Sequence, residues 1–350
     1  MTIAFYISGH GFGHASRSIE VINALADRRP DLRVIIRSDV APWLVQRTVR
    51  PGVTLEPAQC DTGVVQVDSL RPDARATIER GRQFMAAFSD RVAAEAAWLG
   101  RAGATLVVAD IPPLGIAAAS AAGIPGVAFG NFTWDWIYAG YEGGADLADA
   151  IGRVYADTTL ALRLPMSGGF ATMPAVVNIP FVARRSERDP AAAREALGLP
   201  HGERLVLVSF GGYGLDGLNV EALRQLAGYR ILLPGDVDEP ALYARGLRYE
   251  DLVRAADVVV TKPGYGIISE CLANETALLY TSRGQFAEYD VLVTAMPRFL
   301  RAAFIDQAAL FGGAWGPHLD ALLAQPAPQE KPATNGAEIA ARLITELTGD

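Results

Sequence analysis

The sequence contains very little cysteine and lysine. Its 350 residues include two cysteines, Cys60 and Cys271, which have neither the number nor the spacing of a disulfide framework or a zinc site. We therefore expect a reduced, cytoplasmic protein. Lys262 and Lys331 are the only lysines among 31 basic residues, and 39 acidic residues leave a net charge of −8. This charge argues against binding nucleic acid or an anionic membrane through bulk electrostatics.

Long apolar runs and metal-binding patterns are also scarce. No run is long enough for a transmembrane helix, and Met1–Ile7 lacks the basic start of a signal peptide and is typical of a strand. The histidines are His10, His14, His201 and His318, which are too dispersed for a zinc cage beyond the first pair. The absence of a Gly-x-x-x-x-Gly-Lys-Ser/Thr loop excludes a P-loop nucleoside triphosphatase. We expect neither a metal nor a cofactor.

Apolar segments of strand length alternate with helical patterns in both halves of the chain. Half of the residues are hydrophobic and a fifth are charged, and the length suits two domains. Alternating strands and helices predict a parallel sheet in each half, so the fold class is α/β with two doubly wound, Rossmann-like domains facing a cleft. The strands that we expect are 3–7, 32–37, 53–55, 105–109 and 126–129, then 205–209, 229–233, 257–261 and 277–280. A long helical pattern covers 72–99, with Gly81 as a candidate break.

Two polar, proline-containing segments predict the domain boundaries. Residues 182–190 read as a linker, and so do residues 326–332. We expect a first domain at 1–183, a second at 184–333, and a C-terminal helix within 334–350 that packs back toward the first domain.

A strand, a glycine turn and a helix follow one another at 257–274. Val258–Val260 predict a buried strand, the turn contains Lys262, Gly264 and Gly266, and a helix begins near Ile267. Free N–H groups and the dipole at a helix start attract anions, and glycine permits close approach of a phosphate. Glu270, one turn into the helix, is placed to accept hydrogen bonds from a ribose. The alternative is an ordinary tight turn that carries a surface lysine and glutamate.

The first glycine-rich turn, at 8–17, has two readings besides a structural one. Gly9, Gly11 and Gly13 resemble a dinucleotide fingerprint, but position 14 is histidine, so the match is weak, although Arg37-Ser38-Asp39 after the second strand would suit NADP. The other reading makes His14, at a helix start that favours neutral imidazole, a general base oriented by Asp110 at the end of another strand. A capping role for both residues remains the plain alternative.

The two-domain layout resembles the GT-B fold of nucleotide-sugar glycosyltransferases. Residues 263–270, Pro-Gly-Tyr-Gly-Ile-Ile-Ser-Glu, resemble the donor turn of the bacterial N-acetylglucosaminyltransferase that completes lipid II and of plant small-molecule glycosyltransferases. The resemblance implies a donor such as a UDP-sugar, with ribose at Glu270, and it implies His14 as base with Asp110 orienting it. An acid–amide pair for the donor sugar would be Gln285 and Glu288, at looser spacing. The donor-side candidates are Gly211, Gly212, Lys262, Gly264, Tyr265, Gly266, Glu270, Gln285 and Glu288.

A second resemblance covers nearly the whole chain. Residues 9–17, 131–139, 162–165 and 210–212 are similar in order to segments of the N-terminal region of plant L-arabinokinase-type proteins, with Ser16 in place of that family's threonine. The kinase activity of those proteins belongs to a separate C-terminal domain that these segments do not include. The resemblance therefore implies a stand-alone glycosyltransferase-like unit rather than a kinase.

Together these features predict a metal-independent, inverting glycosyltransferase that moves a sugar from a nucleoside-diphosphate sugar to an acceptor hydroxyl. The first domain would bind the acceptor, which the sequence does not identify, and the second the donor. A sugar-nucleotide 2-epimerase and a non-catalytic nucleotide-sugar-binding module remain alternatives, as does His10 as the base. The acceptor-side candidates are His10, Gly11, Gly13, Asn131, Trp134 and Asp135; the alternative for the tryptophan is a place in the core.

Overall fold

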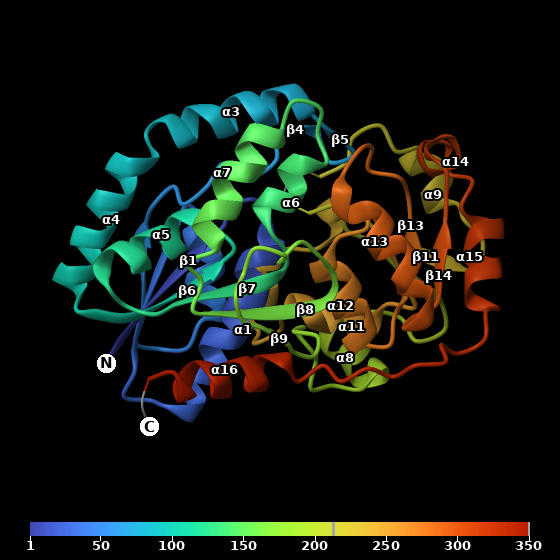
Figure 1. The fold of residues 1–350 in the computed structure, drawn as a ribbon. Helices are drawn as coiled ribbons and strands as arrows, with labels where there is room; N and C mark the ends of the chain where they lie inside the picture. The colour runs from blue at the N-terminus through green and yellow to red at the C-terminus, as the bar shows by residue number, and fades with distance from the viewer. Residues whose placement is uncertain (212–213, 349–350) are drawn as a thin grey trace.

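Two parallel β-sheets organise the computed structural model, which describes residues 1–211 and 214–348 (Figure 1). The first sheet has the strand order β3-β2-β1-β6-β7-β8-β9, and the second has the order β11-β10-β12-β13-β14. Helices connect most successive strands in both sheets. The predicted α/β fold with two doubly wound halves is therefore confirmed.

The first sheet is built on apolar strands that helices cover on both faces, as parallel sheets require. Its strand β1 (Thr2–Ile7), which lies between two other strands, is buried at every residue. The other strands are β2 (Arg33–Ser38), β3 (Val53–Pro57), β6 (Ala104–Asp110), β7 (Gly126–Phe132), β8 (Leu160–Gly168) and β9 (Val176–Asn178). The helices of this half are α1 (Phe12–Arg28), α2 (Pro42–Thr48), α3 (Ala74–Ala86), α4 (Phe88–Ala102), α5 (Pro113–Ala122), α6 (Trp134–Ala139) and α7 (Ala145–Tyr155). A short antiparallel pair, β4 (Gln66–Asp68) and β5 (Arg71–Pro72), stands apart from the sheet.

The second sheet has the same parallel organisation around the valine-rich strand β12 (Val258–Thr261), which is fully buried. Its other strands are β10 (Arg204–Val208), β11 (Tyr229–Leu232), β13 (Ala277–Tyr280) and β14 (Ala302–Phe304). Its helices are α8 (Pro190–Leu197), α9 (Val220–Arg224), α10 (Glu239–Ala244), α11 (Tyr249–Ala255), α12 (Tyr265–Ala273), α13 (Ala287–Ala295), α14 (Gln307–Gly312) and α15 (Gly316–Leu323), with short 3₁₀ turns at Pro234–Asp236 and Met296–Arg298.

The strand order of each sheet reverses at one point, and this reversal positions the site. In the first sheet β1 lies between β2 and β6, so the loops after β1 and β6 lead to opposite sides. In the second sheet β10 lies between β11 and β12, with the same consequence. Ligands of doubly wound sheets bind in the crevice that such a switch point leaves at the carboxyl ends of the strands. Both predicted glycine turns lie at these points.

Two chain segments connect the halves, and they contact each other. Val182 forms a bridge with Asn335, and the Gly336 amide donates to the Phe181 carbonyl at 2.9 Å. The last helix, α16 (Gly336–Glu346), then lies against α1 of the first half, at the lower edge of Figure 1. No helix in the described part of the chain is both long and apolar enough to span a membrane. The domain limits at 183/184 and 333/334 stay predictions.

Three local predictions differ from the structure. The helical pattern at 72–99 breaks at Ala87 and not at Gly81, which lies inside α3 where a β-carbon would come within 3.0 Å of Leu147. Glycine there permits close packing of α3 on α7. Strand β7 continues to Phe132, three residues past the predicted end, so Asn131 belongs to the strand. Strand β8 and the edge strands β9 and β14 were not predicted.

Candidate active site

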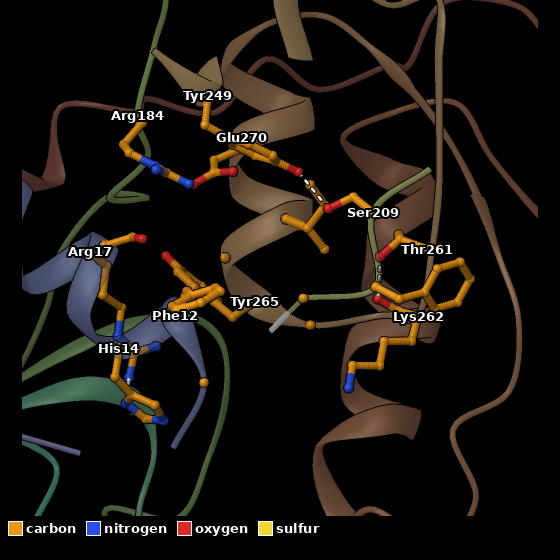
Figure 2. Close-up of a pocket in the computed structure, with 18 of the residues that line it drawn as sticks. Phe12, His14, Arg17, Arg184, Ser209, Tyr249, Thr261, Lys262, Tyr265 and Glu270 are labelled. Carbon is orange, nitrogen blue, oxygen red and sulfur yellow. Dashed lines mark hydrogen bonds and ion pairs between the residues drawn. The ribbon is translucent and has the colours of Figure 1, made fainter. Parts of the chain in front are cut away.

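A cavity of about 330 Å³ lies between the two halves. It is lined by the turns that follow β1, β10 and β12, together with parts of α1, α2 and α12. Figure 2 shows His14 and Arg17 of α1 on one side, Lys262 on the opposite side, and Glu270 with Arg184 above them. One cavity therefore contains both glycine turns that the sequence singles out.

The two helix starts at this cavity lie side by side. Gly11 is the N-cap of α1, with φ 73°, and Gly264 is the N-cap of α12. A β-carbon added at Gly266 would lie 3.4 Å from the Cα atom of Gly13, so the two turns are in contact. Gly11, Gly13, Gly264 and Gly266 all line the cavity. The positive ends of two helix dipoles therefore converge on one space, which favours an anionic group there.

His14 and Asp110 form a buried pair at the first switch point. The Nδ1 atom of His14 lies 2.7 Å from Oδ1 of Asp110, and the aspartate side chain is 0% exposed. Burial would raise the pKa of Asp110, but the charges of Arg17 and His14 outweigh it and lower this pKa to about 2. An ionised carboxylate only accepts hydrogen bonds, so Nδ1 of His14 carries the proton. The Nε2 atom is then the one available as a base.

His10 lines the same cavity but has a different environment. Its Nε2 atom lies 3.3 Å from the amide nitrogen of Gln66, and no carboxylate among the described residues is paired with it. Burial, with His14, Arg283 and Lys262 nearby, lowers the pKa of His10 to about 3. Its ring rests over Gly63, where a β-carbon would lie 2.7 Å from the ring. Of the two histidines in this turn, His14 is therefore the one that is paired with a carboxylate among the described residues.

Two cations lie on the donor side of the cavity. Lys262 follows β12, and its Nζ atom donates to Oε1 of Gln66 at 3.4 Å. Burial and the charge of Arg283 lower the pKa of Lys262 to about 7, against a smaller opposing effect of Asp68. Arg283 is buried and donates to the Pro263 carbonyl at 3.2 Å. A bound anion would therefore meet a lysine that is only partly protonated near neutral pH.

Glu270 lines the cavity, and its carboxylate is paired with an arginine that the sequence did not indicate. Arg184 donates through Nε at 2.7 Å and through Nη2 at 2.5 Å, both to Oε1 of Glu270. The two side chains are 12% and 6% exposed. Arg184 also packs over the ring of Tyr249, whose hydroxyl lies 2.6 Å from Oγ of Ser209 (Figure 2).

The other donor-side candidates divide into three groups. Gly211, Tyr265 and Glu288 line the cavity, and Tyr265 is held in place by stacking on Phe181 at 6.0 Å. Gln285 is exposed and does not line the cavity, since it lies in the bend before α13 and Glu288 lies in the buried first turn of that helix. Gly212 lies outside the described residues.

The acceptor-side candidates also separate. Asn131 lines the cavity and links both halves, because its amide nitrogen donates to Glu288 at 2.6 Å. Trp134 is 1% exposed and does not line the cavity; it stacks on His14 at 6.5 Å and donates to Asp61 at 2.9 Å. Asp135 points toward Gly152 of α7 and away from the cavity. Of these three candidates, only Asn131 lines the cavity, and the tryptophan belongs to the core behind His14.

Two sequence patterns are explained without a ligand. Arg37, which the dinucleotide reading needs, pairs with Glu95 at 2.5 Å and lies 4.4 Å from the Trp98 ring, away from the cavity. The sequence also has one Asp-x-Asp pattern at 236–238. Asp236 is paired with Arg224, and Asp238 caps α10. In the described part of the chain no three His, Cys, Asp or Glu side chains are grouped to hold a metal ion.

Sequence reasoning missed three arginines at the cavity. Arg17 lies three residues after His14, a spacing that places both on one face of α1 and could have indicated their contact. Arg184 lies in the linker and Arg283 in the loop after β13, and neither position has a local signal.

Comparison with known protein sequences gives a curated relative for this chain. No model of a known protein family matches the chain. L-arabinokinase of Arabidopsis thaliana is 29% identical over 363 residues, which cover 99% of this chain but only 34% of that protein. The chain thus spans about a third of the length of this curated relative. The resemblance to that protein, predicted from short segments, extends over the whole chain.

Solved structures give the fold class. A Medicago truncatula UGT complexed with UDP-glucose superposes with a TM-score of 0.62 at 11% identity, covering 99% of this chain and 98% of that one. A Phytolacca americana UGT2 complexed with UDP-2fluoro-glucose and pterostilbene superposes with a TM-score of 0.60 at 15% identity, covering 99% of this chain and 94% of that one. The glycotransferase of kitacinnamycin superposes with a TM-score of 0.61 at 20% identity, covering 99% of this chain and 98% of that one. The chain has the GT-B fold.

Proposed function

We propose that this chain is a glycosyltransferase that moves a sugar from a nucleoside-diphosphate sugar, with UDP as the first carrier to test, to an acceptor hydroxyl. One observation supports this most directly. His14, which is paired with the buried Asp110, shares a single cavity with a glycine-rich helix start and a lysine, although these come from opposite halves of the chain. The first group suits proton removal from an acceptor, and the second suits binding of a diphosphate.

In the proposed reaction His14 takes the acceptor proton at Nε2 while the acceptor oxygen attacks the anomeric carbon. The bond from that carbon to the diphosphate breaks, and the diphosphate leaves with the electron pair. A single displacement of this kind inverts the anomeric configuration. The leaving charge is compensated by the starts of α1 and α12, by Lys262 and by Arg283. The lining also includes Trp43, Leu44, Val237 and Tyr243, whose largely apolar side chains suit contact with a nucleobase.

The experiment is a thermal-shift screen with UDP-, GDP-, dTDP- and ADP-sugars, followed by assays of the tightest ligand. Released nucleoside diphosphate that depends on an added acceptor supports transfer. A new sugar isomer without acceptor would instead indicate an epimerase, and binding without turnover a non-catalytic module. No stabilisation by any nucleotide sugar would contradict the proposal.

Transfer is expected to persist in EDTA, because the cations and helix starts named above compensate the leaving diphosphate. The measurement is the rate of UDP release with and without the chelator. Activity that disappears in EDTA and returns with Mg²⁺ would contradict the metal-independent part of the proposal.

Donor binding is expected to weaken as the pH rises from 6 to 9. The cationic form of Lys262 attracts the diphosphate, and this form is lost as the pH passes through its pKa of about 7. UDP-glucose keeps its charge in this range, so the affinity should fall by up to about tenfold per pH unit, the limit for one proton. Isothermal titration calorimetry measures the Kd at each pH.

The matched control is the other lysine. Lys262→Met should remove most of the pH dependence, whereas Lys331→Met, at a residue that does not line the cavity, should keep the wild-type profile. Lys262→Met should also weaken UDP more than uridine. Equal losses on both ligands would show that Lys262 does not contact phosphate.

A further inference from the structure

Arg17 is a buried arginine, and each of its three guanidinium nitrogens donates a hydrogen bond. Its Nε donates to Oδ2 of Asp110 at 2.7 Å, its Nη2 to Oδ1 of Asp110 at 2.5 Å, and its Nη1 to Oδ1 of Asn131 at 2.5 Å. The arginine side chain is 5% exposed. Burying a charge this deeply is costly unless geometry and pairing are nearly complete, and the planar fork of arginine meets that requirement. A purely apolar side chain would have filled the space at lower cost.

The arginine changes what Asp110 can do for His14. Oδ1 of Asp110 accepts from both His14 and Arg17, and Oδ2 accepts from Arg17 and from Oγ of Ser18 at 2.7 Å. Nη2 of Arg17 also lies 3.0 Å from Nδ1 of His14. The charge of Asp110 is thus already balanced by an arginine, and a second cation on His14 would lie beside the first.

The other groups near His14 include one carboxyl, one further histidine and two aromatic rings. Asp61, after β3, interacts with His14 and is held by Ser8 and Trp134, while His10 lies in the turn after β1. Burial raises the pKa of Asp61 to about 6, so this carboxyl is mostly ionised at pH 7 and attracts a charged His14 ring, an attraction that the charge of Arg17 opposes. From β7 and α6, Phe132 and Trp134 pack on the ring and carry no charge.

We propose that Arg17 is a positioning residue: its two hydrogen bonds to Asp110 fix the carboxylate that selects the Nδ1–H tautomer of His14, and its charge keeps the imidazole neutral, so that Nε2 stays available to accept a proton. The use of Nε2 as a base rests on the proposed function, whereas the tautomer of His14 can be measured whether or not that function is correct. Through Asn131 and Glu288 the same arginine is also connected to the donor half. A histidine–aspartate pair alone would stabilise the imidazolium and lose the base at mildly acidic pH.

The first test is ¹⁵N NMR of the imidazole nitrogens in the ligand-free protein, with the signals of His14 assigned from a His14→Ala variant among the four histidines. In the wild type we expect a single Nδ1–H tautomer at neutral pH. Arg17→Met should give a mixture of tautomers and, with pH, an imidazolium that forms at about one pH unit higher, since an uncompensated carboxylate then faces the ring. Arg17→Lys keeps a cation but not the fork, so it should give mixed tautomers with a smaller change of the pH response.

The matched control is Arg37→Met, which removes another well-buried arginine–carboxylate pair, with Glu95, in the same half of the chain. It should lower stability while leaving His14 and the pH response unchanged. If the folded Arg17→Met variant keeps the single Nδ1–H tautomer of the wild type, the proposal is overturned. If that variant does not fold, the same result in Arg17→Lys overturns the proposal.

Failure of the proposed function is recognised separately. Nucleotide-sugar binding measured by thermal shift on the wild type does not depend on Arg17. Where transfer is measurable, the acidic limb of the rate profile should move to higher pH in Arg17→Met, while KM for the donor stays within about twofold of wild type. An unmoved acidic limb in a folded variant with the altered tautomer would restrict Arg17 to a structural role.

Discussion

The His14→Ala variant is expected to transfer sugar about 10² to 10⁴ times more slowly than the wild type, the usual contribution of a positioned general base. Donor affinity should change little, because Nδ1 of His14 is engaged with Asp110 and its side chain lies across the cavity from Lys262 (Figure 2). The measurement is kcat for UDP release with a verified acceptor, together with the donor Kd by calorimetry. Wild-type turnover in this variant would remove His14 from the chemistry.

Asp110→Asn should slow transfer in the same direction, because an amide no longer selects the Nδ1–H tautomer. The double variant should be little slower than His14→Ala alone, since the two residues act as a unit. Losses that multiply fully would contradict the pair. Stability provides a second readout: Asp110→Asn leaves buried Arg17 without its carboxylate, whereas His14→Ala does not, so only the first should unfold markedly more easily.

Much of the fold was predictable because its signals are local. The apolar runs of β1 and β12 and the glycines that end them determine both switch points, and the strand–turn–helix at 257–274 matches β12 and α12 within one or two residues. Edge strands such as β9 and β14 are short and half exposed, so their composition resembles that of loops. The break at Ala87 escaped prediction because glycine at 81 serves packing against α7 rather than a bend.

The site was only partly predictable, for a different physical reason. His14 and Asp110 each follow from a position at a strand end or helix start, which sequence reveals. The partners that control them come from distant segments: Arg184 lies in the linker, and Asn131 contacts Glu288 across 157 residues of sequence. Trp134 looked like a ligand wall because an aromatic cluster follows a strand, yet its place behind His14 depends on how α6 folds back onto the sheet.

Because Glu270 is paired with Arg184, replacing it should change both UDP binding and the stability of the fold. Glu270→Ala should weaken UDP binding by about 1.5–3 kcal/mol, the cost of losing hydrogen bonds to a charged group, if its carboxylate holds the ribose. It should also destabilise the fold by about 3–5 kcal/mol, because it leaves Arg184 buried and unpaired. Calorimetry with UDP and denaturant unfolding without ligand measure the two effects.

The double variant Glu270→Ala with Arg184→Met separates the two roles of the carboxylate. Removing both charges should restore part of the stability, since Arg184 is no longer left buried without its partner, while the nearby buried Glu250 loses one neighbouring cation. UDP affinity should stay low, because a methionine offers no acceptor for the ribose hydroxyls. Arg184→Met alone frees Glu270 and should bind UDP no worse than the wild type. If the double variant recovers UDP affinity together with stability, Glu270 serves only to anchor the linker, and the ribose must be bound by other residues of the cavity.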